Sequence, residues 1–191
     1  MKVLLVLTLL SRIFLLTGCS SLNPGETIVA SMDNESRPKW ARQSEIIENK
    51  DGKIRFLGFE EVDGQARISS ALELSDYRTV GEVSTFLTTK FNKVFQRLEE
   101  GLQGNGLVTR EVGMRVSKSV IKNLRLVGRY WEKVVIVDPD GNRDLRLRVY
   151  SLGEIKETDL RSLIDQELGT AIPEAIREEA KNAFVEEISN F

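Results

Sequence analysis

The stretch VGRYWEKVVIVDPDGNRDLRLRVYSLGEI, residues 127–155, decides the fold. Two runs rich in valine, leucine and aromatic residues, Val127–Val137 and Leu145–Ile155, flank the segment DPDGNRD. Asp-Pro and Asp-Gly are strong turn formers, so the two runs are predicted to pair as an antiparallel hairpin. In the second run apolar residues alternate with arginines, which indicates one buried and one solvated sheet face.

The sequence before the hairpin predicts a strand and a long helix. The segment IRFLGF, Ile54–Phe59, lies between two Asp-Gly pairs and has the composition of a strand flanked by turns. From Ala66 to about Leu102, apolar residues recur at intervals of three and four, which indicates an amphipathic helix. Gly81 is a candidate break, because an unbroken helix of this length would extend about 53 Å.

The remaining segments are predicted to be helical. The glycines of GLQGNG, residues 101–106, are expected to end the long helix, because a phosphate-binding loop would follow a strand. A second helix is indicated by apolar residues at every fourth position from Val108 to Leu124. Thr158 is expected to cap a helix that Gly169 stops, and Pro173 to open a last helix. The last helix is expected to dock on the sheet, although a partner-binding helix would show the same pattern.

The N-terminal residues have the layout of an export signal. Lys2 precedes the mostly apolar run Val3–Leu16, which Arg12 interrupts. A charge at the centre of a membrane helix costs about 2.5 to 3.5 kcal/mol. The eleven strongly apolar residues of the run contribute about 3 to 7 kcal/mol, so the segment still favours insertion. At about 14 residues it is short for a permanent span.

The single cysteine follows this run directly. Leu16-Thr17-Gly18-Cys19 resembles a bacterial lipobox, in which the cysteine is lipidated and the chain is cut before it. The alternative is a plain secretory peptide with an incidental cysteine. Ser20 resembles an outer-membrane sorting signal, so the resemblance implies an outer-membrane protein, anchored by lipid and facing the periplasm.

These segments divide the chain into three parts. Residues 1–18 are the expected signal peptide, residues 19–37 the lipidated cysteine with a flexible tether, and residues 38–191 one domain. The run Thr27–Ala30 leaves an ordered strand open inside the tether. The expected domain is α+β, a small antiparallel sheet made of a strand and then a hairpin, packed with long helices.

Composition restricts the chemistry. The 191 residues contain no histidine and one cysteine, which removes the usual general base and rules out an intrachain disulfide. A net charge of −2 argues against nucleic-acid binding. The expectation is a non-catalytic protein with no cofactor beyond the lipid on Cys19. Its expected partners are the membrane, a second copy of the chain, or another envelope protein.

Two sets of residues are candidates for binding. The oxygen-bearing side chains of DPDGNRD alternate as in calcium loops, although the segment lacks the glycine and glutamate positions of an EF-hand and equally suits a tight turn. These side chains are Asp138, Asp140, Asn142 and Asp144. A ligand groove could use Trp40, Tyr130 and Trp131, although such aromatics also pack in cores.

Charge is distributed unevenly along the sequence. Residues 110–133 carry seven basic and two acidic residues, whereas residues 154–191 carry ten acidic and four basic residues. The two segments could offset each other within one fold, or they could form complementary surfaces between subunits. Anionic lipid headgroups are a third candidate partner for the basic segment.

The order of these features resembles one known family. The lipobox, the Pro38-Lys39-Trp40 entry, FLGF before the long helix, and RYWEK paired with RVYSLGEI are similar to the twenty-kilodalton outer-membrane lipoprotein family. Its relatives include the flagellum-associated lipoprotein P and the amino-terminal domain of flagellar protein T. The similarity covers roughly Pro38 to Glu167. It implies a compact α+β domain that acts by assembly in the envelope; a tethered ligand- or calcium-binding module is the alternative.

Overall fold

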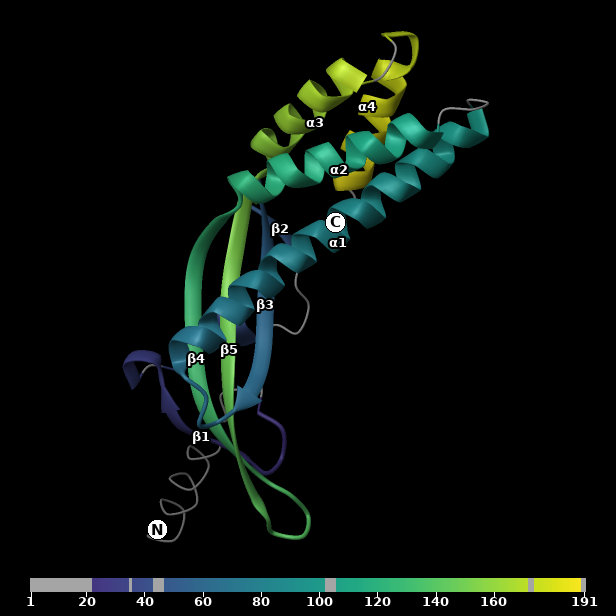
Figure 1. The fold of residues 1–191 in the computed structure, drawn as a ribbon. Helices are drawn as coiled ribbons and strands as arrows, with labels where there is room; N and C mark the ends of the chain where they lie inside the picture. Colours follow the sequence, from purple (N-terminus) through teal and green to yellow (C-terminus); the bar gives the residue numbers. More distant parts are fainter. Residues whose placement is uncertain (1–21, 35, 43–46, 102–105, 172–173, 190–191) are drawn as a thin grey trace, which may run out of the picture.

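The computed structural model describes residues 22–34, 36–42, 47–101, 106–171 and 174–189. Within these ranges the chain forms a five-stranded antiparallel sheet and four α-helices, which confirms the α+β class (Figure 1). The strand order is β1-β4-β5-β3-β2. The sheet thus contains the predicted strand and hairpin together with an edge strand on each side.

The predicted hairpin is the centre of the sheet. β4 (Arg125–Val137) and β5 (Arg143–Lys156) pair along their length, with one irregularity between Leu126 and Gly128. In β5, Leu147 has no exposed surface, while the alternate side chains face the opposite side of the sheet. The alternation therefore predicted correctly which side chains share a face, but the face that carries Arg148 is not solvated as expected, because the N-terminal segment covers it and leaves Tyr150 only 5% exposed.

The predicted strand at IRFLGF is longer than expected. β3 (Lys53–Asp63) pairs with β5 over its whole length, and β2 (Ile47–Lys50) pairs with β3. The β2–β3 turn contains Asp51 at φ 54° and Gly52 at φ 69°. Two consecutive positive φ angles are typical of the turns that match the twist of a hairpin, and this turn adds the edge strand.

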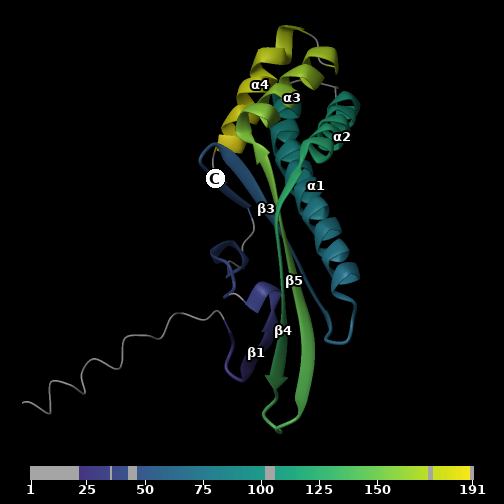
Figure 2. The same ribbon diagram turned by 90° about the vertical axis from the view of Figure 1, so that its left-hand side faces the viewer.

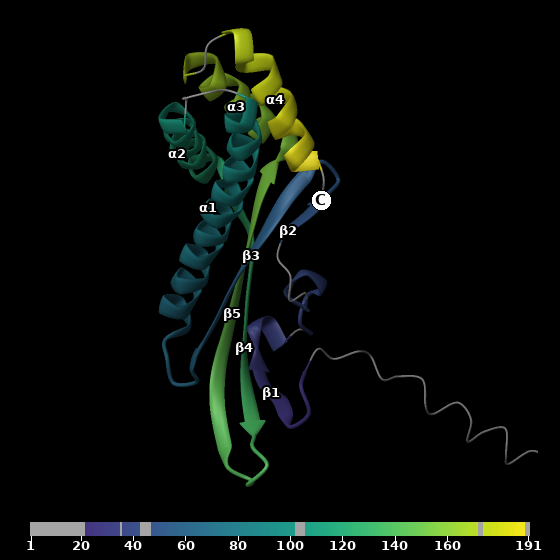
Figure 3. The same ribbon diagram turned by 90° about the vertical axis from the view of Figure 1, so that its right-hand side faces the viewer.

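The segment expected to be a flexible tether contains the other edge strand. β1 (Glu26–Ser31) pairs with β4, so the ordered alternative at Thr27–Ala30 is the correct one. After β1 the chain leaves the edge and runs over the sheet face that faces away from α1, with a short 3₁₀ helix at Lys39–Arg42 (Figures 2 and 3). We call the described residues 26–34 and 36–42 the N-terminal strap.

The opposite face of the sheet is covered by α1 (Ile68–Gly101). Its 34 residues make a helix of about 51 Å, and Gly81 does not break it. Gly81 lies on the exposed side, whereas Thr79 and Val83 are fully buried. Burial of the neighbouring side chains thus outweighs the weak helix propensity of one glycine.

The other helices gather at one end of the molecule. α2 (Gly106–Asn123) packs against α1, while α3 (Glu157–Ala171) and α4 (Glu174–Ser189) lie beyond the end of the sheet (Figure 1). Thr158 is inside α3 rather than its cap, because the helix begins directly after β5. Gly169 does not stop α3, which continues to Ala171.

The main hydrophobic core lies where the four helices meet this end of the sheet. The rings of Phe91 and Phe184 join α1 to α4 with centroids 4.5 Å apart, and those of Phe56 and Phe86 join β3 to α1 at 5.5 Å. Leu160, on α3, completes this set with no exposed surface. The apolar stripes of the C-terminal helices are therefore packed inside the fold, although α4 packs mainly on α1 and α3 and not on the sheet as expected.

Candidate functional site

The lipobox lies outside the described residues. Leu16, Thr17, Gly18 and Cys19 precede the first described residue, Leu22. The chain joins the sheet at Gly25, whose carbonyl oxygen accepts a hydrogen bond of 3.0 Å from the amide of Val137. A chain lipidated at Cys19 would thus have a short connection to the sheet. None of the described helices combines the length and apolar composition of a bilayer-spanning segment.

The DPDGNRD segment forms a tight hairpin turn. Both side-chain oxygens of Asp138 accept hydrogen bonds of 2.8 Å from Asn142, one from its backbone and one from its side chain. These bonds lower the pKa of Asp138. Gly141 has a φ of 85°, and Asp144 pairs with Arg146 at 2.6 Å. The carboxylates of Asp138 and Asp144 are thus used in local contacts, and the described residues contain no cluster of three or more acidic, histidine or cysteine side chains placed for a metal ion.

The three candidate aromatic residues do not share a groove. Tyr130 is buried, and Trp40 packs with it on the strap side of the sheet. Trp131 follows Tyr130 in β4 and therefore packs on the opposite face, against Leu147 and α1. The structure places these aromatics in two separate clusters, because neighbours in a strand point to opposite sides.

The strap covers a buried ionic cluster that the sequence analysis missed. Glu132, in β4, has no exposed surface, and its carboxylate accepts two hydrogen bonds from the guanidinium of Arg37 in the strap. One of these, from Arg37 Nε to Glu132 Oε2, is 3.0 Å long. The Arg37 guanidinium also lies over the ring of Tyr150, 5.7 Å from its centroid. These contacts fix the strap to the centre of the sheet.

The electrostatics of this cluster follow from its burial. Burial opposes the charge of Arg37, but the hydrogen bond to Glu132 raises its pKa overall. Burial also raises the pKa of Tyr150, and the nearby negative charge of Glu132 adds to that effect. The cluster therefore holds a charged pair beside a neutral phenol.

A second ion pair fixes the start of the strap. The guanidinium of Arg148 donates two hydrogen bonds, of 2.9 and 2.7 Å, to the carboxylate of Glu26 in β1. It donates a third, of 2.6 Å, to Glu61 in β3. The bonds from Arg148 lower the pKa of Glu26 to about 2, against the opposing effect of burial. Arg148 thus links three strands across the strap side of the sheet.

One sequence signal could have revealed this cluster. Glu132 lies between Tyr130 and Val134 on the same face of a strand, and both neighbours are apolar or aromatic. An acidic residue at an inward position of a strand needs a buried cation, since an unpaired charge is costly there. The partner, Arg37, is 95 residues away, so the sequence could not identify it.

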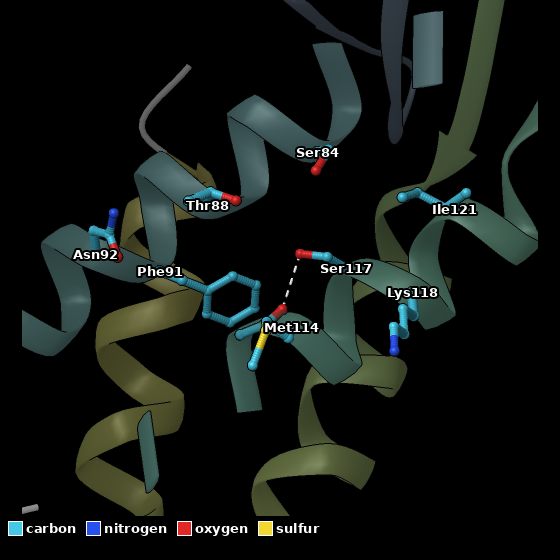
Figure 4. A pocket seen from close by; sticks show the side chains of 9 residues that line it. Ser84, Thr88, Phe91, Asn92, Met114, Ser117, Lys118 and Ile121 are labelled. Carbon is cyan, nitrogen blue, oxygen red and sulfur yellow. Dashed lines mark hydrogen bonds between the residues drawn. The ribbon is translucent and has the colours of Figure 1, made fainter. Parts of the chain in front are cut away.

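A groove lies between α1 and α2. It has a volume of about 360 Å³, and it lies where small side chains face each other across the two helices (Figure 4). Ser84, Thr88 and Asn92 lie on the α1 wall at one-turn intervals. The α2 wall carries Met114 and Lys118, both exposed. The groove thus combines apolar surface, hydroxyl and amide groups, and one cation.

Together these features define an α+β protein whose sheet is covered by helices on one face and crossed by its own N-terminal strap on the other. Comparisons of this chain with family models, with curated proteins and with solved structures give no match. The resemblance to the outer-membrane lipoprotein family therefore stays a prediction.

Proposed function

We propose that this chain is a lipid-anchored protein of the bacterial outer membrane, with a structural role in assembly on the periplasmic side of the envelope. The observation that carries the proposal is the sequence Leu16-Thr17-Gly18-Cys19 at the end of an apolar run. The thiol of Cys19 is the group that such an anchor requires, since a thiolate is a far better nucleophile than a hydroxyl.

The strap supports an anchored role. Only six residues separate Cys19 from Glu26, the first residue of β1. Force on a lipid at Cys19 would act first on β1 and then on the Glu26–Arg148 and Arg37–Glu132 pairs. A buried salt bridge adds little net stability but specifies one arrangement, which suits a segment that connects an anchor to a folded domain.

The family resemblance extends the proposal to the biological process in which the chain would act. If the chain acts like the relatives that it resembles, its partners belong to flagellar or other envelope assembly. In-cell cross-linking of the full chain, followed by identification of the attached proteins, tests this part. Recovery of no envelope protein and no second copy would contradict an assembly role.

Palmitate labelling tests the anchor directly. The full chain and its Cys19→Ser variant are expressed in a bacterium supplied with labelled palmitate, and the envelope is then fractionated. We expect the native chain to carry label and to enter the outer-membrane fraction, and the variant to lose both. Ser20→Asp is the matched variant for sorting, and it should keep the label but move to the inner membrane. Equal labelling of the native chain and Cys19→Ser would refute the proposal.

A further inference from the structure

We infer that the groove between α1 and α2 is a docking site for a second copy of this chain, whose acidic helix α4 lies against it. The inference rests on the proposed assembly function and names its interface. It follows from the charges that α2 and α4 expose, from the lining of the groove, and from the position of both helices in the molecule.

The groove is bordered by basic residues of α2. Lys118 and Lys122 lie one turn apart on the exposed side of α2, and neither makes an ion pair or hydrogen bond to a described residue. Arg115 is exposed on the same helix. Met114, 56% exposed, adds apolar surface beside them. This border therefore favours an acidic and partly apolar occupant.

The opposite wall of the groove supplies further hydrogen-bond donors. The hydroxyl groups of Ser84 and Thr88 and the amide of Asn92 lie along α1 (Figure 4). Ser117, at the floor, bonds back to the carbonyl oxygen of Gly113 at 2.8 Å, so its hydroxyl is already used. The small residues leave room for the side chains of another helix, as in other helix-in-groove contacts.

The same chain exposes the complementary charge. On α4, Glu174 and Glu178 lie one turn apart on the exposed side, and Glu179 is exposed beside them. None of the three carboxylates pairs with a residue in the described part of the chain. Their spacing of one helical turn, about 6 Å, equals that of Lys118 and Lys122. A carboxylate row from one copy can therefore meet a lysine row from another.

The position of the groove favours a second copy over a lipid surface. The N-terminal strap joins the sheet at the end that carries the hairpin turn, whereas α2 and α4 lie at the opposite end (Figure 1). A chain held to a bilayer at Cys19 would carry the lysines of α2 away from the headgroups. Because one copy carries both the groove and the acidic helix, each copy can bind the next, which gives a chain or a ring.

The test is zero-length cross-linking of mixed isotopic copies. Full chain labelled with ¹⁵N and unlabelled full chain are purified in detergent, mixed and treated with a carbodiimide, which joins lysines to carboxylates. We expect peptides that join Lys118 or Lys122 of one isotope to Glu174, Glu178 or Glu179 of the other. Raising the salt to 1 M should reduce their yield, since it shortens the screening length to about 3 Å.

Charge reversal supplies the controls. Lys118→Glu with Lys122→Glu should lower the yield of mixed-isotope dimers by about tenfold or more, read on intact protein. Adding Glu174→Lys and Glu178→Lys should restore it. Lys156→Glu, at an exposed position on β5, is the matched variant and should leave the yield of mixed-isotope dimers unchanged.

Two results would overturn the inference. One is cross-links confined to one isotope, and the other is a native dimer yield unaffected by Lys118→Glu with Lys122→Glu. Palmitate labelling is read separately, so failure of the anchor and failure of this interface are distinct results.

Discussion

Glu132 and Arg37 show how a single buried pair determines the path of a chain segment. Both side chains are almost fully removed from water, at 0% and 9% exposure. Removing two charges from water opposes folding, and their hydrogen bonds offset much of that cost only when both partners are present. The pair therefore selects one position for the strap, because any other position leaves a buried carboxylate without a cation.

Removing one member of this pair should be strongly destabilising. Glu132→Ala leaves the Arg37 guanidinium buried without its partner, so we expect the free energy of unfolding to fall by about 3 to 5 kcal/mol in urea denaturation. Arg146→Ala breaks the exposed pair with Asp144 and should change it by no more than about 0.5 kcal/mol. Similar losses for the two variants would contradict the described role of Glu132.

The Glu26–Arg148 pair predicts a pH dependence of stability. The pKa of Glu26 is about 2 in the folded chain and near 4.5 without its partner, so folding favours the carboxylate. Its contribution is therefore complete above pH 4.5 and is lost as the pH falls toward 2. The native chain should exceed Glu26→Gln in unfolding free energy by about 3 kcal/mol more at pH 6 than at pH 2. Asp140→Asn is the exposed control, and a constant difference for Glu26→Gln would contradict the prediction.

At the residue scale, local patterns were informative and distant partners were not. The turn at DPDGNRD follows from residues within five positions, and the structure has the expected turn. The pairing of Glu132 with Arg37 depends on the complete sheet and strap. The same limit applies to Trp40 and Trp131, which share chemistry but lie on opposite faces.

Between elements, α1 and β3 approach each other at a glycine. The Cβ of an alanine at Gly58 would collide with the carbonyl oxygen of Ser75 and lie 2.6 Å from the amide nitrogen of Thr79. Thr79 also donates a hydrogen bond of 3.1 Å to the carbonyl oxygen of Ser151 in β5. The long helix thus contacts the sheet through backbone atoms at this point. Backbone atoms cannot move aside as the end of a flexible side chain could.

Two glycine substitutions in this region should have opposite effects on the free energy of unfolding. Gly58→Ala pushes α1 from the sheet and should lower the free energy of unfolding by about 3 kcal/mol or more. Gly81→Ala, in the same helix with open space around the added atom, should raise it by about 0.5 to 1 kcal/mol. Thermal denaturation of both variants checks the pair, and a loss of stability in Gly81→Ala would argue against a continuous α1.

The hydrogen bonds in the hairpin turn should stabilise the fold whether or not calcium is present. Asp138→Ala removes the two hydrogen bonds with Asn142 and should lower the free energy of unfolding by about 1 kcal/mol. The loss should be equal with and without millimolar calcium, because the turn is held by its own side chains. A rise in the melting temperature of the native chain with calcium, absent in Asp138→Ala, would instead support the calcium hypothesis.

At the element scale, periodicity predicted the long elements, left β1 open as an alternative to a flexible tether, and missed β2. β3, β4, β5 and the helices carry enough apolar residues in register to be recognised. β1 and β2 have only six and four residues, and edge strands gain their order from the neighbour that they pair with. Gly81 was wrongly considered a break in the helix. The burial of the residues on both sides of Gly81 holds the helix together, and that burial depends on the tertiary structure.

For the whole molecule, the strap places the proposed anchor at one end. The carbonyl of Gly25 bonds to the amide of Val137, one residue before the hairpin turn. Six residues from Cys19 to Gly25 extend at most about 21 Å. From the turn, the 14 residues of β5 run about 46 Å toward the helices. A lipid on Cys19 therefore holds the turn near the bilayer and leaves the α3–α4 end far from it.

This orientation can be measured on the lipidated full chain. A fluorescent non-natural residue is placed at Asp140, in the turn, or at Gln166, exposed on α3, because the only cysteine, Cys19, is the proposed site of lipid attachment. In liposomes with an energy acceptor on the headgroups, we expect strong transfer from position 140 and weak transfer from position 166. Since the reach of the tether is about 21 Å and β5 spans about 46 Å, the difference should persist when the domain tilts. Equal transfer from both positions would mean that the molecule lies flat on the membrane, and the groove between α1 and α2 would then be within reach of the lipid.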